Sequence, residues 1–236
     1  MTEQKYELVV LTHNDLDGLG CMLNIEYKLP DVKKKFFFTN YSDLDTVSHE
    51  VIEFAKANDI GTVIVPDVSF SDHKDALRSL YAALKVIHID HHMYPDGFWD
   101  EFPEMKVVHS IDKSATMHCN EYLKNTGKNH KLDGLSGLID VFDIWRTEHK
   151  AFPVSQDLNE YFWATGQMEM FDKISNSGYG LPDDFLEVTQ KVKDQYTAEI
   201  QEFEDKKLIH RANRITVAFV NKWFNHIVIK EMNQGQ

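Results

Sequence analysis

Histidine and aspartate side chains gather in three segments of this sequence, each directly after an apolar run. The segments are HNDLDG at residues 13–18, a single aspartate after VIVP, and DHH at residues 90–92. They supply seven candidate ligands: His13, Asp15, Asp17, Asp67, Asp90, His91 and His92. Imidazole and carboxylate groups without a nearby thiolate suit Mn²⁺, or alternatively Mg²⁺, better than a structural zinc ion. One ion cannot use so many groups, so we expect two.

A pair of divalent ions supports a particular kind of chemistry. Such a pair lowers the pKa of a bound water and stabilises the attacking and leaving oxygens at phosphorus. The pattern therefore predicts hydrolysis of a phosphate ester or anhydride. Without metal, the clustered carboxylates should raise one another's pKa values, and metal binding should weaken as the pH falls. Taken alone, residues 13–17 fit an Asx-rich turn equally well, but the other two segments favour the metal interpretation.

Alternating strands and helices are needed to bring the three segments together. Apolar and β-branched runs predict strands at 6–13, 36–41, 61–67, 84–90 and 106–111. Helical patterns separate the first four strands, at 18–29, 44–57 and 71–80. This order predicts an α/β fold with an open, mostly parallel sheet and helices on both faces. Ligands of such sheets gather at the carboxyl ends of the strands, where all three segments fall.

The chain after residue 114 changes to mainly helical patterns. We divide the sequence into a catalytic core at 1–150, a helical extension at 151–181, a connecting helix at 182–213 and a strand and helix at 214–236. The last segment is too short to form its own core. It must pack on the main body, pair with a second copy of the chain to give a homodimer, or begin a further C-terminal domain.

The composition limits the partners that we expect. The chain has 236 residues, of which 42% are hydrophobic, and a formal net charge of −13. This charge disfavours broad contact with nucleic-acid backbones, so we expect a short nucleotide or oligonucleotide as substrate. The sequence lacks a long apolar run and a basic, apolar N-terminal leader, which predicts a cytoplasmic protein without a membrane partner. The two cysteines, Cys21 and Cys119, are expected to be buried thiols.

The motifs resemble those of the DHH phosphoesterase superfamily, which includes RecJ-type exonucleases, oligoribonucleases, cyclic-dinucleotide phosphodiesterases and family II inorganic pyrophosphatases. The similar segments are HNDLDG, the aspartate after VIVP, DHH, and an aspartate in GLIDVFDIW, all within residues 6–146. The resemblance implies a hydrolase with two Mn²⁺ ions. It implies that the first ion takes His13 and Asp15, the second takes Asp17, His91 and Asp143, and Asp67 bridges them.

The same resemblance assigns further roles. His92 would face the scissile phosphate, and Asp90 would orient its neighbours. Asp143 fits the family pattern better than Asp140, which lies three residues earlier on the same predicted helix and could instead be an ordinary surface acid. Arg146 is a candidate phosphate contact or, alternatively, a member of a surface ion pair.

Ser114 opens a predicted helix, where a serine most simply acts as a cap. The family has a similar residue at this place, which makes Ser114 a candidate phosphate contact at the helix N-terminus.

The expected function is hydrolysis of phosphodiester or phosphomonoester bonds in short nucleotides. One alternative is an inorganic pyrophosphatase of the same superfamily, although HNDLDG differs from the Asn-Pro-Asp motif of that branch. The other is a binding protein that keeps the fold and lacks activity. It is suggested by the absence from this sequence of the glycine-rich GGGH-like motif of the DHHA1 domain.

Overall fold

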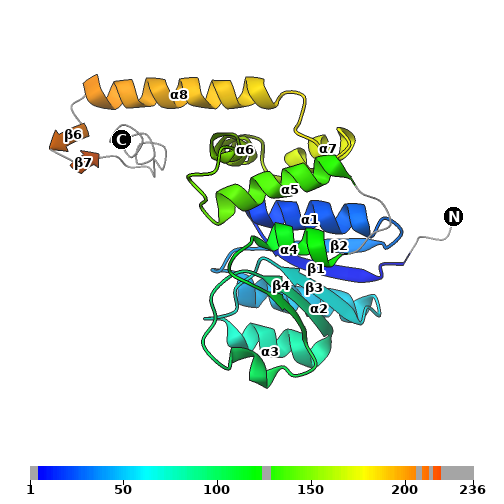
Figure 1. Ribbon diagram of the computed structural model, residues 1–236. Helices are drawn as coiled ribbons and strands as arrows, with labels where there is room; N and C mark the ends of the chain where they lie inside the picture. Colours follow the sequence, from blue (N-terminus) through cyan, green and yellow to red (C-terminus); the bar gives the residue numbers. More distant parts are fainter. Residues whose placement is uncertain (1–4, 124–128, 206–208, 213–214, 219–236) are drawn as a thin grey trace. The chain divides into compact units, whose positions relative to one another are not determined.

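A five-stranded sheet forms the centre of the protein (Figure 1). The computed structural model describes residues 5–123, 129–205, 209–212 and 215–218. The strands of the sheet are β1 (Leu8–His13), β2 (Lys34–Thr39), β3 (Thr62–Pro66), β4 (Lys85–Asp90) and β5 (Lys106–His109). Their spatial order is β2-β1-β3-β4-β5, and every pair is parallel. The predicted open α/β sheet is confirmed.

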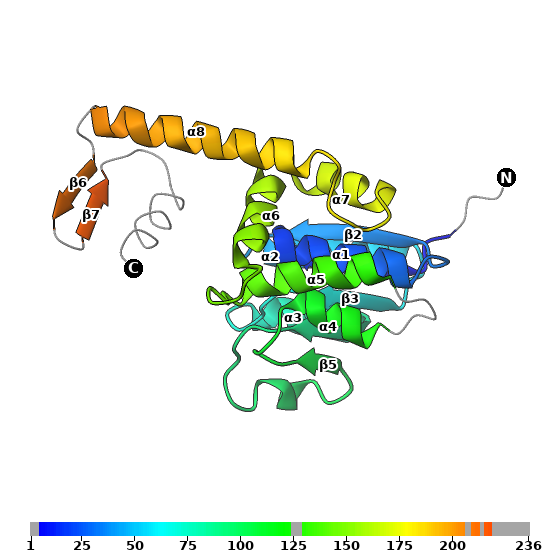
Figure 2. The ribbon, with the colours of Figure 1, turned by 45° about the horizontal axis from the view of Figure 1, so that its top comes forward.

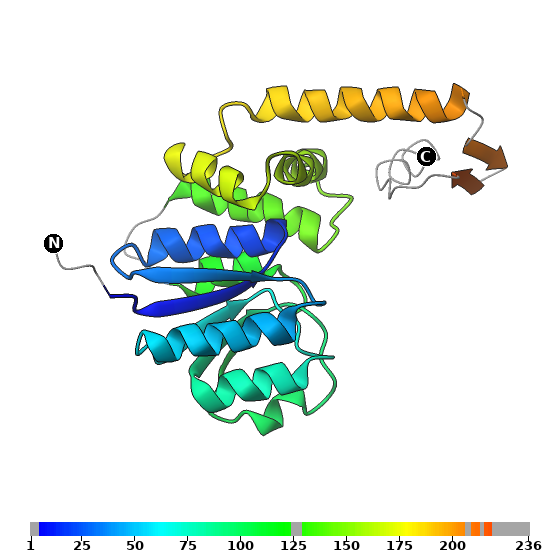
Figure 3. The same ribbon diagram turned by 180° about the vertical axis from the view of Figure 1, so that it is seen from behind.

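Helices cover both faces of this sheet, as expected (Figures 1 and 3). One face packs against α2 (Leu44–Ala57) and α3 (Lys74–Ala83), and the other against α1 (Leu16–Lys28) and α4 (Ala115–Tyr122). The alternation of side chains along a strand explains this arrangement. In β1, Val9 and Leu11 belong to the first core, and Leu8 and Val10 belong to the second. The second core also contains both cysteines, which are buried and free, as predicted.

Helices α5 (His130–Asp143), α6 (Phe152–Thr165) and α7 (Gln167–Asn176) follow α4 in the first part of the chain. Figure 2 shows α5 beside α1 and α4. A short 3-10 helix, η1 (Phe98–Glu101), lies between β4 and β5.

The order of the strands creates one special position at the sheet edge. Helix α1 leads from β1 to β2 on one side, whereas α2 leads from β2 back past β1 to β3 on the other. The crossovers therefore diverge between β1 and β3. In open α/β sheets, ligands bind in the crevice outside the carboxyl ends of the strands at this point. HNDLDG follows β1, and Asp67 follows β3.

Several predicted boundaries differ from the structure. Strand β2 begins at Lys34, two residues before the predicted start. The side chain of Lys34 is almost fully buried, and its ammonium donates to the carbonyl oxygens of Leu29 and Val32. This local pairing lets a charged residue enter a strand that we had expected to begin with phenylalanine. Helix α3 begins three residues later than predicted and also ends three residues later, and β5 ends two residues earlier.

The chain divides into two compact units, residues 1–183 and 184–236. In the second unit the structure describes α8 (Phe185–Asp205) and an antiparallel pair, β6 (Ile209–Ala212) and β7 (Ile215–Ala218). The connecting helix predicted at 182–213 is therefore too long, because residues 209–212 form a strand that pairs with β7. Helical spacing of apolar residues does not reveal such pairing between strands. The predicted strand near 214–220 is confirmed as β7. The helix and dimer contact predicted for the last residues lie outside the described part of the chain. None of the described helices has the length and apolar character needed to cross a bilayer.

Candidate metal centre

The first part of the site forms where β1 meets α1. Asp15 caps α1, because its Oδ1 accepts a hydrogen bond from the Gly18 backbone N–H at 2.9 Å. Its Oδ2 lies 2.7 Å from Nδ1 of His13. Burial alone would raise the pKa of Asp15, but the hydrogen bond and charge of His13 outweigh burial and lower it. A Cβ at Gly18 would lie 2.0 Å from the His13 carbonyl oxygen, so this tight approach requires glycine.

Asp17 is held by the N-terminus of α4, which lies far away in the sequence. Its two carboxylate oxygens accept hydrogen bonds from the backbone N–H groups of Ala115 and Thr116, each at 2.9 Å. The Thr116 hydroxyl also donates to the Asp17 carbonyl oxygen at 2.8 Å. The unpaired N–H groups and the dipole of a helix N-terminus favour a negative group there. Helix α4 thus fixes the orientation of a candidate metal ligand.

Ser114 is the N-cap of α4, and its side chain accepts a hydrogen bond from the Met117 backbone N–H. The cap interpretation is therefore confirmed. The Ser114 backbone N–H donates to Oδ1 of Asp140 at 2.7 Å. Protein carboxylates already use the N–H groups of residues 114–116, and the predicted phosphate contact of Ser114 remains a prediction.

Asp67 follows β3 in a backbone conformation that is uncommon for a residue with a side chain. Its φ is 56°, in the left-handed region, and its N–H donates to the Ile89 carbonyl oxygen of β4 at 2.9 Å. Strained positions of this kind concentrate at functional sites. The residue is only 2% exposed. Among the described residues, Oδ2 of Asp67 has no hydrogen-bond partner.

His91 joins the carboxylates that come from different segments. Its Nε2 lies 3.5 Å from Oδ1 of Asp67, 3.7 Å from Oδ2 of Asp17 and 3.3 Å from Oδ2 of Asp143. Three overlapping groups each have potential ligand atoms within 4.8 Å of one another. They are His13, Asp15 and Asp67; Asp17, His91 and Asp143; and Asp67, Asp90, His91 and His92. The fold therefore brings together all the residues that the sequence proposes as metal ligands.

Mutual repulsion and burial make this cluster unfavourable without a counter-charge. Burial raises the pKa of Asp67 well above its usual range, and the charges of Asp15 and Asp17 add to this effect. Burial and the charge of Asp17 also raise the pKa of Asp143, to about 10. The pKa of Asp17 itself is raised by burial, although His91 partly opposes the shift. Carboxylic acids in this state must lose protons before they can bind a cation.

The donor set fits divalent ions. Oδ2 of Asp143, like Oδ2 of Asp67, is buried and has no hydrogen-bond partner among the described residues. Buried polar atoms nearly always form hydrogen bonds in folded proteins, so two buried oxygens without one, in a cluster of carboxylates and an imidazole, indicate a place for a cation. Carboxylates and imidazoles are ligands for Mn²⁺ and Mg²⁺, and no cysteine belongs to the described groups.

His92 lies beside the cluster and is oriented by a buried carboxylate. Its Nδ1 is 2.8 Å from Oδ1 of Asp90, and the Tyr94 hydroxyl donates to Oδ2 of Asp90 at 2.5 Å. Burial would raise the pKa of Asp90, but the hydrogen bond from His92 and the charges of nearby histidines hold it well below its usual range. Asp90 is therefore a carboxylate, and it can only accept hydrogen bonds. Consequently Nδ1 of His92 carries a proton and donates a hydrogen bond to Asp90.

Sequence reasoning missed how three side chains support the site. Thr116 and Tyr94 hold Asp17 and Asp90, as described above, and Tyr41 touches His92. The Tyr41 hydroxyl lies 3.2 Å from Nε2 of His92. Its position two residues after β2, at the same sheet edge as the acids, was the available signal.

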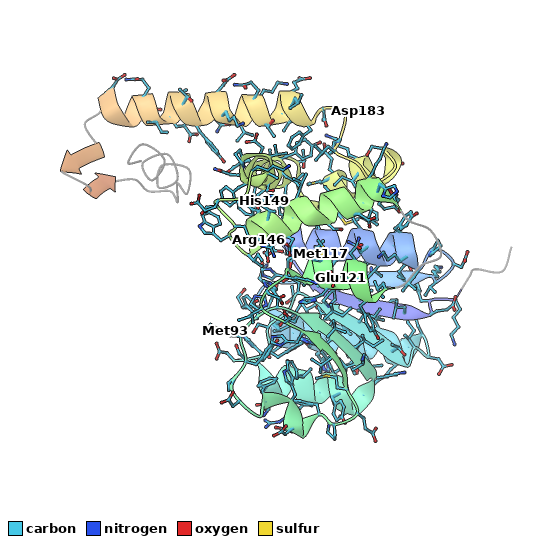
Figure 4. All side chains as sticks on the ribbon, in the orientation of Figure 1. Met93, Met117, Glu121, Arg146, His149 and Asp183 are labelled. Carbon is cyan, nitrogen blue, oxygen red and sulfur yellow. The ribbon has the colours of Figure 1, made fainter. Side chains whose placement is uncertain are left out.

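The two aspartates near the end of α5 have different surroundings. Asp143 reaches His91, whereas Asp140 accepts the Ser114 N–H and pairs with Arg146, whose Nη1 lies 3.1 Å from Oδ2 of Asp140. Arg146 also donates to the Asp112 carbonyl oxygen at 2.8 Å. Figure 4 labels Arg146 just beyond α5. Asp140 is 2% exposed, so the expectation of an ordinary surface acid is wrong. Arg146 forms an ion pair with this buried acid, and its phosphate contact stays a prediction.

Comparisons with known proteins concern the fold. The sequence matches no protein-family model and no curated protein. An uncharacterized protein from Helicobacter pylori G27 has a similar crystal structure, with 12% identity and a TM-score of 0.60, covering 98% of this chain and 80% of that chain. Exonuclease RecJ bound to manganese matches with 16% identity and a TM-score of 0.45, covering 87% of this chain and 64% of that one.

RecJ in complex with Mn²⁺ from Thermus thermophilus matches with 18% identity and a TM-score of 0.46, covering 87% of this chain and 37% of that chain. The present chain spans less than two thirds of either RecJ chain. At these identities, the similarity to the Helicobacter protein shows the α/β fold alone.

Proposed function

We propose that this protein is a metal-dependent phosphoesterase that hydrolyses phosphodiester or phosphomonoester bonds of short nucleotides. The observation that carries the proposal is the convergence of four sequence segments, with two buried carboxylate oxygens left unpaired, at Asp67 and Asp143. The motifs of these segments resemble those of DHH phosphoesterases, which agrees with the proposal.

Two sets of ligands would each hold one ion, preferably Mn²⁺. His13 and Asp15 form the first set, and Asp17, His91 and Asp143 form the second. Asp67 lies close to ligand atoms of both sets. When bound, such ions activate a water and stabilise the charge that develops on phosphate oxygens. Backbone N–H groups hold the carboxylates of Asp15 and Asp17, and the N–H of Asp67 fixes the backbone of that residue to β4.

His92 is the chain's own candidate for contact with the phosphate. Its side chain is one-third exposed, whereas Asp90 behind it is fully buried. The hydrogen bond to Asp90 fixes the orientation of the imidazole and places Nε2 away from the carboxylate. Burial opposes a charge on His92, but Asp90 outweighs this effect and raises the pKa of His92. A protonated His92 could donate a hydrogen bond to a phosphate oxygen or to the leaving group.

The charge of the protein limits the size of the substrate. A net charge of −13 repels long polyanions at a distance, and a short nucleotide meets less of this repulsion. Pyrophosphate is small as well, so the assay must include it together with dinucleotides, short oligoribonucleotides and nucleoside monophosphates.

The test compares two aspartates that share a left-handed backbone. Asp67 has a φ of 56°, and Asp59 has a φ of 55° but an exposed side chain that pairs with Lys5. Asparagine tolerates this conformation, so neither Asp67→Asn nor Asp59→Asn should strain the backbone. We expect Asp67→Asn to lower Mn²⁺-dependent hydrolysis by at least about 100-fold, because residues that merely support a ligand already contribute about 10- to 100-fold.

Asp59→Asn should leave both Mn²⁺ affinity and hydrolysis unchanged. Calorimetric titration of Mn²⁺ provides the second measurement, with Asp67→Asn expected to bind the ion more weakly than the parent protein. Equal hydrolysis by the parent and by Asp67→Asn would refute the proposal. If the protein cleaves pyrophosphate and none of the nucleotides, it is an inorganic pyrophosphatase and the proposed nucleotide substrate is wrong.

A further inference from the structure

Tyr41 lies at the metal centre, although the sequence predicted no site residue at the end of β2. It follows β2 by two residues, and the centroid of its ring is 5.1 Å from that of His13. Its ring also lies 6.4 Å from His73 in a stacked arrangement and 6.3 Å from His92, edge-on. Tyr41 therefore contacts a candidate metal ligand and the candidate phosphate-binding histidine at the same time.

The Tyr41 hydroxyl meets the outer nitrogen of His92. Nδ1 of His92 is hydrogen-bonded to Asp90, so Nε2 is the nitrogen that remains for other partners. The Tyr41 hydroxyl lies 3.2 Å from Nε2, and a phenol can donate to a neutral imidazole or accept from a protonated one. In either state the hydroxyl occupies the one nitrogen of His92 that is available to a substrate.

A comparison with Tyr94 separates a structural role from a binding role. The Tyr94 hydroxyl donates a hydrogen bond to the fully buried carboxylate of Asp90, on the side of Asp90 that does not contact His92. Tyr41, in contrast, is 38% exposed, and its hydroxyl meets the outer nitrogen of the imidazole. A bound phosphate that approaches His92 must displace or join the Tyr41 hydroxyl. A phenol needs only a small rotation to exchange one acceptor for another nearby.

We propose that Tyr41 is a substrate-binding residue, whose hydroxyl moves from Nε2 of His92 to donate a hydrogen bond to a non-bridging oxygen of the bound phosphate. This proposal rests on the proposed function and adds a neutral donor to it. Hydrogen bonds to charged groups are stronger than neutral ones, so phosphate is the better acceptor for this hydroxyl. In the free protein, the bond to Nε2 keeps the hydroxyl near its place of use.

The experiment removes only the hydroxyl. Tyr41→Phe keeps the ring that packs on His13, and Tyr81→Phe removes a hydroxyl near the far end of α3 as a matched control. Mn²⁺ affinity, inorganic phosphate affinity in the presence of Mn²⁺, and hydrolysis are measured for each protein. We expect Tyr41→Phe to bind Mn²⁺ as the parent does, to bind phosphate about 10- to 100-fold more weakly, and to lose kcat/KM by a similar factor. Tyr81→Phe should match the parent in all three.

The results distinguish this proposal from the proposed function. If the parent hydrolyses nucleotides and Tyr41→Phe retains its phosphate affinity and kcat/KM, Tyr41 has no binding role and the proposed function stands. Weaker Mn²⁺ binding in Tyr41→Phe would assign the residue to the support of His13 and overturn the proposal. If the parent hydrolyses no phosphoester, the proposed function fails, and phosphate affinity alone decides the role of Tyr41. A parent that neither hydrolyses phosphoesters nor binds phosphate contradicts both.

Discussion

Gly20 offers a sharp test of how the fold positions the metal centre. It lies in α1, where the helix passes α4 closely. A Cβ at this position would lie 2.0 Å from Oγ1 and 2.8 Å from Cγ2 of Thr116, and 2.7 Å from Cδ1 of Ile139. Thr116 is fully buried and anchors Asp17, so it has little freedom to retreat. Gly20→Ala must therefore separate α1 from α4 or α5.

The magnitude follows from two opposing effects. Alanine in place of glycine inside a helix stabilises a protein by about 0.5–1 kcal/mol. Overpacking of a dense core costs about 1–3 kcal/mol, and a Cβ at Gly20 would make three contacts below 3.0 Å. We expect a net loss of about 1–2 kcal/mol in the free energy of unfolding. Gly134, on α5, has open space within 4 Å of the place that a Cβ would take, so Gly134→Ala should gain about 0.5–1 kcal/mol.

Urea unfolding, evaluated by linear extrapolation, measures both variants. Because separation of α1 from α4 also disturbs the N–H groups that hold Asp17, we expect Gly20→Ala to bind Mn²⁺ more weakly, with Gly134→Ala unchanged. A Gly20→Ala protein that is as stable as Gly134→Ala would show that α4 does not pack against Gly20 as described. A destabilised protein with unaltered Mn²⁺ affinity would contradict the link between this packing and the site.

Two further predictions concern protons and the choice of ligand. The raised pKa values of Asp67 and Asp143 mean that the folded, metal-free protein keeps protons that the unfolded chain loses near pH 4. Its stability should therefore fall as the pH rises from about 4 towards the folded pKa of Asp143, about 10, and Mn²⁺ binding at neutral pH should release protons. Melting curves and calorimetry in buffers of different ionisation enthalpy measure these effects, and a flat profile without proton release contradicts them. Asp143→Asn should weaken Mn²⁺ binding without loss of stability, because a neutral amide replaces an acid that is protonated in the metal-free protein and whose Oδ2 makes no hydrogen bond. Asp140→Asn should instead cost about 1–2 kcal/mol, through its bonds to Ser114 and Arg146, at nearly constant Mn²⁺ affinity. If Asp140→Asn instead loses Mn²⁺ affinity and Asp143→Asn loses stability, Asp140 is the metal ligand.

The sequence was informative wherever a local pattern determines the position of a side chain. Strand ends could be located from apolar runs, and parallel strands share one carboxyl edge, so His13, Asp67 and His91 could be placed together before the structure was known. The spacing of Asp15 and Asp17 after β1 has the same local origin. These residues needed no knowledge of which helix covers which face.

Long-range partners could not be found in this way. Asp17 depends on α4, which no local pattern connects with HNDLDG, and the role of Tyr41 depends on β2 lying beside β1. The start of β2 was misplaced for a different reason. Charged residues such as Lys34 usually lie in solvated turns, but the Lys34 ammonium donates to backbone carbonyl oxygens and is buried. For Asp17 and Tyr41 the deciding contacts join segments whose proximity is a property of the complete fold, whereas the contacts of Lys34 are local but involve backbone atoms that a residue pattern does not reveal.

The anchors of the acidic residues explain how the fold tolerates such a cluster. Asp17 is held by two N–H groups of α4, Asp15 by the first turn of α1, and Asp90 by Tyr94 and His92. Helices α1 and α4 both pack in the second apolar core, and Tyr94 packs against the first. Repulsion among the carboxylates therefore cannot open the site without also disrupting buried helices. Of the acids that the structure describes, Asp67 and Asp143 keep unpaired buried oxygens, and a divalent ion that binds there relieves the repulsion without competing for any existing hydrogen bond of those atoms.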